Sequence, residues 1–165
     1  MSGPILALRR AILETAQADA ELAAAMGGHV RLHDEPPRAA EPVYGVFGSV
    51  TAKDWSTDTD RGHEQDLAVV LWAKAGSSRS ALLAAERLAV LAMNAARARD
   101  PDAWQYAYGS AVARALAGDD PRPAIADALR LNPKEPLVLR LARAMDTDSE
   151  ARWRRAAARA KIPDQ

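Results

Sequence analysis

The chain has 165 residues, and 48% of them are hydrophobic, which is enough for one core or two small ones. It has no cysteine, which excludes disulfide bonds and thiolate metal sites, and its 22 basic and 22 acidic residues give the whole molecule no strong attraction to nucleic acid or a membrane. Aromatic residues make up only 5%, so the core must rely on close contacts between small side chains.

The charge differs between the two halves of the chain. Residues 1–93 carry 9 basic and 12 acidic residues, and residues 94–165 carry 13 and 10. This asymmetry indicates two segments of different character. The start lacks the long apolar stretch of a signal peptide, and the longest strongly apolar run, 67–73, is too short to span a bilayer. We therefore expect a cytoplasmic protein without membrane contact.

The first 26 residues are predicted to be helical. An apolar stripe with helical spacing contains Ile5, Leu8, Ile12 and Ala16. Asp19 can cap a second, short helical turn, and Gly27 and Gly28 end it.

Between residues 29 and 74 the apolar period changes to alternation, which predicts strands. The expected strands are 29–33, 43–51 and 64–74, separated by a proline-containing loop and a polar turn. In the last strand Leu67, Val69 and Leu71 point to one face. Val70 and Trp72 point to the other. A strand that is apolar on both faces is expected to be covered on both sides, by a helix, a second sheet or a partner subunit.

The rest of the chain is predicted to be helical. One helix is expected over 78–99, and four short ones follow. The start signals are Asp100-Pro101, Asp120-Pro121 and the pair Thr147 and Glu150, which has the spacing of a capping box. We predict an α+β fold with a small antiparallel sheet of two to three strands and flanking helices, followed by an all-α segment of about four short helices.

Five spaced motifs link this pattern to a known family. They are RLHDEPP at 31–37, VYGVFG at 43–48, WST at 55–57, GHEQDL at 62–67 and VLW at 70–72. Over residues ~4–93 the chain resembles the phage and gene-transfer-agent tail-completion (tail-terminator) family. Members are α+β domains that form a ring on the end of the tail tube. The resemblance therefore implies a virion assembly protein without catalytic residues, a ring-shaped homo-oligomer that binds tail-tube and head-completion proteins. Its expected location is the host cytoplasm and then the virion or phage-like particle.

The segment after Asn94 departs from that family. In members of that family the second helix is followed by a further pair of strands. In this chain, apolar and polar residues do not alternate anywhere after Asn94. Residues 100–109 and 128–136 instead weakly resemble tetratricopeptide-type helical repeats. We predict a tail-terminator-like domain, 1–98, without its last strand pair, joined as in a fusion or chimera to a helical-hairpin segment, 99–165. An alternative function is a helical-repeat interaction adaptor without a role in tails.

Metal and catalytic sites find little support in the sequence. His29 and His33 are four residues apart, but they lie on a predicted strand with no third ligand in a motif. His63-Glu64 begins like a zinc-protease motif, but Leu67 stands where the second histidine belongs. We expect surface histidines, no metal, no cofactor and no enzyme activity, because no acid–base pair or nucleophile remains.

The polar turn between the two long strands is the candidate partner-binding site. It is rich in carboxylates but lacks the spacing of a calcium-binding loop. An aromatic residue within such a loop is a reasonable contact anchor. The candidate residues are Trp55, Asp58, Asp60 and Arg61. The alternative is a tryptophan folded back on its own domain.

The last predicted helix is basic. It carries Arg152, Arg154, Arg155, Arg159 and Lys161. Phosphate contacts with nucleic acid would need such residues, but the patch is short and interrupted by alanine. A solvated helix face is the expected explanation, and nucleic-acid binding is not expected.

Overall fold

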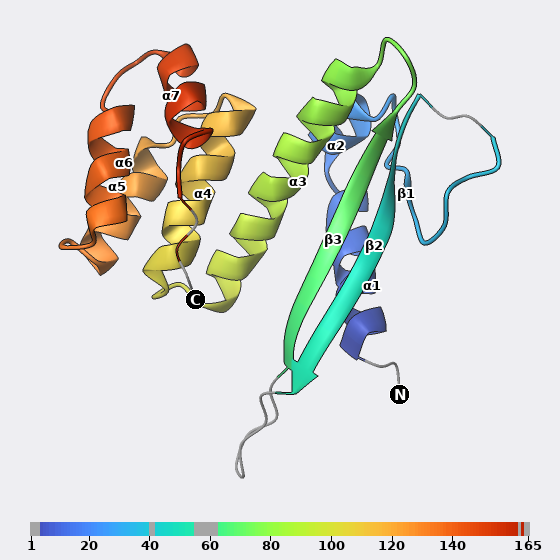
Figure 1. Ribbon diagram of the computed structural model, residues 1–165, viewed down its shortest axis with the longest axis horizontal. Coiled ribbons are helices and arrows are strands. Elements are labelled where there is room, and N and C mark those ends of the chain that lie inside the picture. The colour runs from blue at the N-terminus through green and yellow to red at the C-terminus, as the bar shows by residue number, and fades with distance from the viewer. Residues whose placement is uncertain (1–3, 40–41, 55–62, 162, 164–165) are drawn as a thin grey trace. The chain divides into compact units, whose positions relative to one another are not determined.

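The computed structural model describes residues 4–39, 42–54, 63–161 and 163 (Figure 1). The chain divides into two compact units, 1–85 and 86–165, which we call the N-terminal unit and the helical unit. Helix α3 (Ser78–Arg99), which has the predicted bounds, begins in the first and ends in the second. The sequence pattern predicts a division at 98/99, and separate domains of 1–98 and 99–165 stay a prediction.

Two helices open the N-terminal unit and follow the predicted pattern. Helix α1 (Pro4–Gln17) buries Ala16 of its apolar stripe. Asp19 caps α2 (Ala20–Ala25), because its carboxylate accepts a hydrogen bond from the backbone N–H of Leu22 at 2.8 Å. Gly27 then adopts a left-handed conformation with φ 90°, which ends the helix.

The N-terminal unit contains a three-stranded sheet in the order β1-β2-β3. β2 (Val43–Asp54) and β3 (His63–Ala73) form the predicted long antiparallel hairpin. β1 (Leu32–His33) is shorter than the predicted strand over 29–33 and pairs with β2 in parallel, so the sheet is mixed rather than wholly antiparallel. The parallel register aligns Leu32 with Gly45 and His33 with Val46, so β1 runs in the same direction as β2.

One face of the sheet packs against α1. Val43 and Phe47 are buried there. The guanidinium of Arg9 in α1 lies 5.5 Å from the centre of the Phe47 ring and 3.1 Å from a carboxylate oxygen of Asp34. This one side chain therefore links α1 to β2 through a cation–π contact and to the loop after β1 through an ion pair.

Four helices follow α3 in the helical unit, as predicted. They are α4 (Trp104–Ala117), α5 (Arg122–Leu131), α6 (Pro136–Met145) and α7 (Glu150–Ala157). Together with the sheet they confirm the α+β fold followed by an all-α segment. Among the described residues after Ala73 there is no strand. The resemblance to tetratricopeptide repeats stays a prediction.

Three of the predicted helix caps are wrong, and one of them is Asp120, because α5 begins after Pro121 and has no side-chain cap. Helix α4 begins after Ala103, because the carboxylate of Asp100 accepts a hydrogen bond from the N–H of Asp102 within the preceding turn. Helix α7 begins after Ser149, whose own N–H donates to the Thr147 hydroxyl. In both places a bond within the turn competes with the helix end for the same side-chain oxygen.

The helical core is built from small residues around two aromatic anchors, Tyr108 and Trp153. Buried alanines line the contacts between α4, α5 and α7: Ala107, Ala111, Ala115, Ala124, Ala128 and Ala157. The indole N–H of Trp153 donates to the carbonyl of Thr147 at 2.7 Å, which satisfies its polar group inside the core. The aromatic rings thus provide the bulk that the alanines lack.

Arg122 connects three parts of the helical unit. It lies 5.5 Å from the Trp153 ring, and it pairs with Asp120 at 2.8 Å and with Asp148 at 2.6 Å. Its hydrogen bonds hold the pKa of the Asp120 carboxyl below its ordinary value. The start of α5 is thereby joined to the turn between α6 and α7.

Ion pairs attach the second half of α3 to the other helices of the unit. The carboxylate of Glu86, only 8% exposed, accepts a hydrogen bond from Arg154 of α7 at 3.1 Å. Arg154 also binds Glu150 at 2.9 Å. Farther along α3, Arg97 pairs with Asp127 of α5. These contacts explain why residues from Glu86 onward belong to the helical unit.

No helix in the described parts of the chain has both the length and the apolar character needed to cross a membrane.

Gly45 allows the three strands to meet in the core, and replacing it by alanine tests this packing. A β-carbon at Gly45 would lie 2.5 Å from a methyl group of Leu32 and 2.9 Å from one of Leu71, so both side chains must shift. We expect Gly45→Ala to lower the free energy of unfolding by about 1–3 kcal/mol in urea denaturation, the usual cost of overpacking. Ser49→Ala on the same strand is the control. An unchanged stability of Gly45→Ala would contradict this packing.

Tyr108 predicts a dependence of stability on alkaline pH. Its hydroxyl donates to the carbonyl of Lys161 at 2.9 Å, and burial raises the pKa of Tyr108 above its ordinary value of 10.0. The stabilisation is therefore complete below that ordinary value and is lost as the pH rises through the raised pKa of the folded state.

We expect the free energy of unfolding to fall more steeply above about pH 10 in the wild type than in Tyr108→Phe. Urea titrations at a series of alkaline pH values measure the two slopes. Tyr106→Phe, which removes a phenol from the same helix, is the matched control. Identical slopes for Tyr108→Phe and the wild type would refute the assignment.

Candidate functional site

The hairpin of β2 and β3 has two faces of different character. Paired residues of antiparallel strands share a face, so Tyr44 with Trp72 and Val46 with Val70 lie opposite the buried face that packs against α1. With Ala68, which has the same alternation in β3, these residues define a surface that we call the open sheet face.

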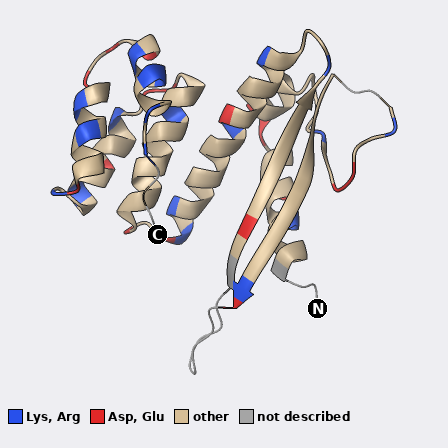
Figure 2. Cartoon of the chain, viewed as in Figure 1, with Lys and Arg blue, Asp and Glu red and all other residues tan. Residues whose placement is uncertain are grey.

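The open sheet face is apolar and accessible. Val70 is 44% exposed and Trp72 is 53% exposed, whereas Val43 and Phe47 on the other face are buried. Figure 2 shows that the strands lack charged residues over most of their length, and charges occur only toward the hairpin end. Exposed large apolar side chains of this kind are typical of interaction sites.

The apolar pattern of β3 predicts that both of its faces are covered by a helix, a second sheet or a partner subunit, and for the open sheet face this stays a prediction. Val70 and Trp72 remain about half exposed. Within the described residues of the N-terminal unit, neither a helix nor a second sheet buries them fully. Val70 and Trp72 are not among the partner-binding residues predicted from the sequence. The signal that pointed to them was the apolar pattern on both faces of one strand.

β3 also has a free edge within the described part of the chain. The strand order β1-β2-β3 leaves one side of β3 without a neighbouring strand. Such an edge presents backbone N–H and C=O groups that can pair with another strand. The free edge adjoins Val70 and Trp72, so one strand offers both an apolar surface and hydrogen-bonding groups.

The partner-binding residues predicted from the sequence cannot be placed. They are Trp55, Asp58, Asp60 and Arg61. All four lie outside the described residues, and their role stays a prediction. Next to them the two strands pair as far as Asp54 with His63, and the Thr51 hydroxyl donates to the Asp66 carboxylate at 3.2 Å.

The two histidines that share a helix-like spacing do not lead to a metal site in the described residues. His29 is exposed, and the His33 ring lies 6.4 Å from the Tyr44 ring, centre to centre. Over 4–39, 42–54, 63–161 and 163, no three histidine, aspartate or glutamate side chains are placed to hold a metal ion.

Comparison with known families finds one match. The family described as Tail completion protein gp17 matches residues 10–105, more than half of the chain. The match runs from α1 through the sheet and α3 to the first residues of α4, and it contains the whole open sheet face. It confirms the family resemblance of the sequence motifs. No curated protein and no solved structure matches the chain.

The two faces of the hairpin should respond differently to the same substitution. We expect Trp72→Ser to change the free energy of unfolding by about 1 kcal/mol or less, because the side chain is half exposed. Phe47→Ser on the buried face should cost about 3–5 kcal/mol, as large-to-small changes in a core do. Urea denaturation of both variants measures this. A similar large loss for Trp72→Ser would show that the open sheet face is part of the core.

Proposed function

The chain belongs to the tail completion protein gp17 family, and from this membership we propose that it caps the end of a tail tube as a closed ring of identical copies. Tail completion is a step of virion assembly, and that role follows from the family itself. The proposal adds the ring, the surface through which copies meet and the partners on either side.

The exposure of the open sheet face is the observation that supports the proposed ring. A surface with a half-exposed tryptophan, a half-exposed valine and a free strand edge loses water and gains backbone hydrogen bonds when a neighbouring copy covers it. Tryptophan is also among the residues that contribute most to binding energy at interfaces. The surface lies within the segment that matches the family.

A closed ring needs two different surfaces on each copy, because its contacts are head-to-tail. The second surface is supplied by the exposed leucines near the start of α3, Leu82 (58% exposed) and Leu83 (41% exposed). Both are large apolar side chains within the matched segment. In the ring, this part of α3 on one copy covers the open sheet face of the next.

The partners of the ring are the tail-tube protein and the head-completion proteins. The turn with Trp55, Asp58, Asp60 and Arg61 binds one of them, because it joins an aromatic anchor to charged groups of both signs. The chain therefore works by surface complementarity and carries out no chemical step. It acts in the host cytoplasm and stays in the finished phage or gene-transfer-agent particle.

Light scattering on the purified full-length chain tests the ring. The wild type should have one mass that is a whole multiple of 17.7 kDa and does not change with concentration. The double variant Val70→Arg/Trp72→Arg should be a folded monomer, because two charges on the open sheet face cannot be buried between copies. Leu82→Glu/Leu83→Glu should also be monomeric.

Leu6→Arg is the matched control. Leu6 is 61% exposed on α1, outside both proposed surfaces, so this variant should keep the wild-type mass. Circular dichroism should show wild-type helix content in all variants. A monomeric wild type, or a ring that survives Val70→Arg/Trp72→Arg, would overturn the proposal. A mass that grows with concentration would indicate an open filament and would overturn it too.

A further inference from the structure

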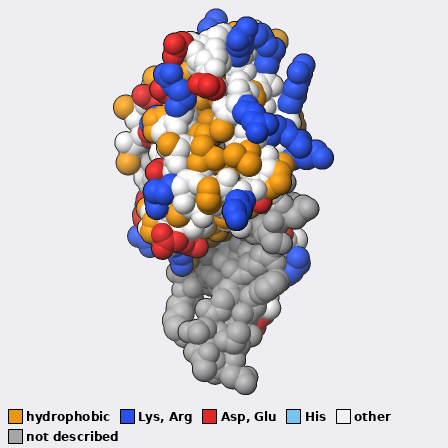
Figure 3. All heavy atoms as spheres, turned by 90° about the vertical axis from the view of Figure 1, so that its left-hand side faces the viewer, with side chains coloured by type: hydrophobic (Ala, Val, Ile, Leu, Met, Phe, Trp, Pro, Cys, Tyr) orange, Lys and Arg blue, Asp and Glu red, His pale blue; other side chains and the backbone are white. Residues whose placement is uncertain are grey.

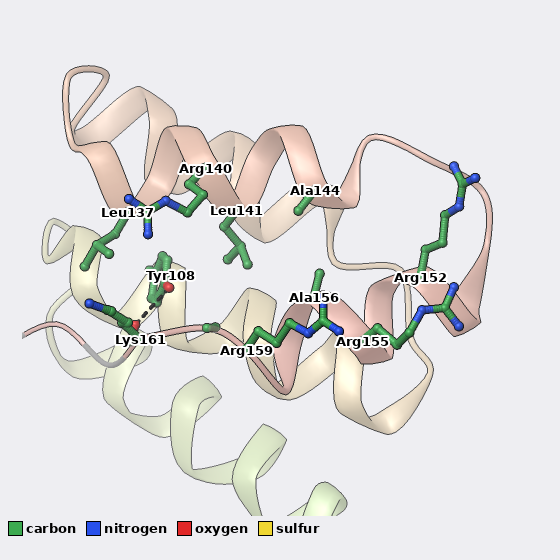
Figure 4. A pocket seen from close by; sticks show the side chains of 11 residues that line it. Tyr108, Leu137, Arg140, Leu141, Ala144, Arg152, Arg155, Ala156, Arg159 and Lys161 are labelled. Atoms are coloured by element: carbon green, nitrogen blue, oxygen red, sulfur yellow. Dashed lines mark hydrogen bonds between the residues drawn. The ribbon is translucent and has the colours of Figure 1, made fainter.

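A groove of about 420 Å³ lies between α6 and α7 in the helical unit, with Tyr108 of α4 at its base (Figure 4). We call it the α6–α7 groove. Its apolar lining comes from Leu137, Leu141, Ala144 and Ala156. Its volume is within the range of about 300–1,000 Å³ that is usual for binding sites. All lining residues lie beyond residue 105, outside the segment that matches the tail completion family.

The groove is strongly basic. Five of its lining residues are cationic: Arg140, Arg152, Arg155, Arg159 and Lys161. None of the lining residues is acidic. Figure 4 shows Arg140 on α6 and Arg159 just after α7 on opposite sides of the groove. In Figure 3, which views the left-hand side of Figure 1, many Lys and Arg side chains and fewer Asp and Glu side chains lie around an apolar area. The groove thus has an apolar base and a positive rim.

In the described part of the chain, no ion pair neutralises the positive rim. Elsewhere in the helical unit, Arg97 pairs with Asp127, Arg122 with Asp120 and Asp148, and Arg154 with Glu86 and Glu150. Among the described residues, none of the five cations of the groove forms an ion pair with a carboxylate. Their charges therefore add to a local positive potential that attracts an anionic ligand.

We propose that the α6–α7 groove binds an acidic peptide segment of a partner protein, in which carboxylates flank an apolar side chain. The guanidinium groups of Arg140 and Arg159 bind the carboxylates, a geometry that suits bidentate hydrogen bonds. The apolar side chain covers Leu137 and Leu141 at the base. The bound segment gains charge-assisted contacts at the rim and loses water from its apolar side chain at the base.

The dimensions and the lining favour a peptide over a nucleic acid. Helix α6 has 10 residues, which at 1.5 Å per residue is roughly 15 Å, the span of about four to five residues of extended chain. A nucleic-acid strand would bring phosphates to the rim but would offer no aliphatic side chain to cover the apolar base. A peptide with mixed acidic and apolar side chains matches both parts of the groove.

The inference is independent of ring formation. The open sheet face belongs to the N-terminal unit and the groove to the helical unit, so either site can fail while the other stands. It gives the helical segment a binding role in addition to tail completion.

Fluorescence anisotropy with the full-length chain tests the proposal. The probe is a fluorescein-labelled peptide of sequence Glu-Leu-Asp-Leu-Glu. We expect it to bind at least about tenfold more tightly than Gln-Leu-Asn-Leu-Gln, which lacks the charges, and than Glu-Ser-Asp-Ser-Glu, which lacks the apolar side chains. Added NaCl should weaken the binding, because the rim contacts are partly exposed to solvent.

Variants separate the groove from general charge. Arg140→Gln/Arg159→Gln should weaken binding of the probe at least about tenfold, the loss of two charge-assisted contacts. Ala144→Glu should abolish it, because it adds a like charge at the exposed base. Arg143→Gln is the control, since Arg143 is an exposed arginine of α6 outside the groove, and it should bind as the wild type does.

Several results would overturn the proposal. One is equal binding of the three peptides, and another is wild-type binding by Arg140→Gln/Arg159→Gln. Tighter binding of a labelled oligothymidylate than of the acidic peptide would assign the groove to nucleic acid. If the same double variant lowered the mass of the oligomer without changing peptide binding, the occupant would be a second copy of the chain.

Discussion

The rest of this structure depends on how closely its backbones approach one another. With aromatic residues at 5%, most core side chains bury little area, so strands and helices must lie near each other to exclude water. Gly45 lets Leu32 and Leu71 meet across β2. Gly109 does the same in α4, because a β-carbon there would lie 2.6 Å from the sulfur of Met93 in α3. Cores packed in this way have little room for an added methyl group.

Some of the charged side chains hold the fold together, and a separate set of cations lines the α6–α7 groove. Arg9, Arg97, Arg122 and Arg154 hold elements together through carboxylates and aromatic rings. Among the described residues, the cations of the α6–α7 groove form no ion pair with a carboxylate, and they give the helical unit a positive surface. The sheet of the N-terminal unit is nearly free of charge between its ends. The two units therefore offer surfaces of opposite kinds, one suited to apolar contact with a copy and one suited to an acidic partner.

Part of the candidate functional site could be predicted from the sequence, and part could not. The alternation in β3 revealed a strand with two apolar faces, and the motifs around it indicated the family that residues 10–105 confirm. The alternation could not tell which face of β3 is covered, because both faces read alike in a strand such as 67–72. Val70 and Trp72 became candidates only when their exposure was known. The groove could not be predicted from the sequence either. The basic residues of the last helix have the pattern of a solvated helix face, and only the placement of α6 beside α7 makes them one side of a groove.

The sequence by itself determined the elements and most of their ends. The bounds of α3, the Asp19 cap of α2 and the stop at Gly27 follow from periodicity, capping and backbone freedom, all of which act within a few residues. Only the tertiary structure decided that β1 pairs with β2 in parallel, that one face of the sheet is open, and that Arg140 and Arg159 face the same groove. These features join residues far apart in the chain. They depend on which surfaces pack against each other and exclude water, and a local sequence pattern contains no information about that packing.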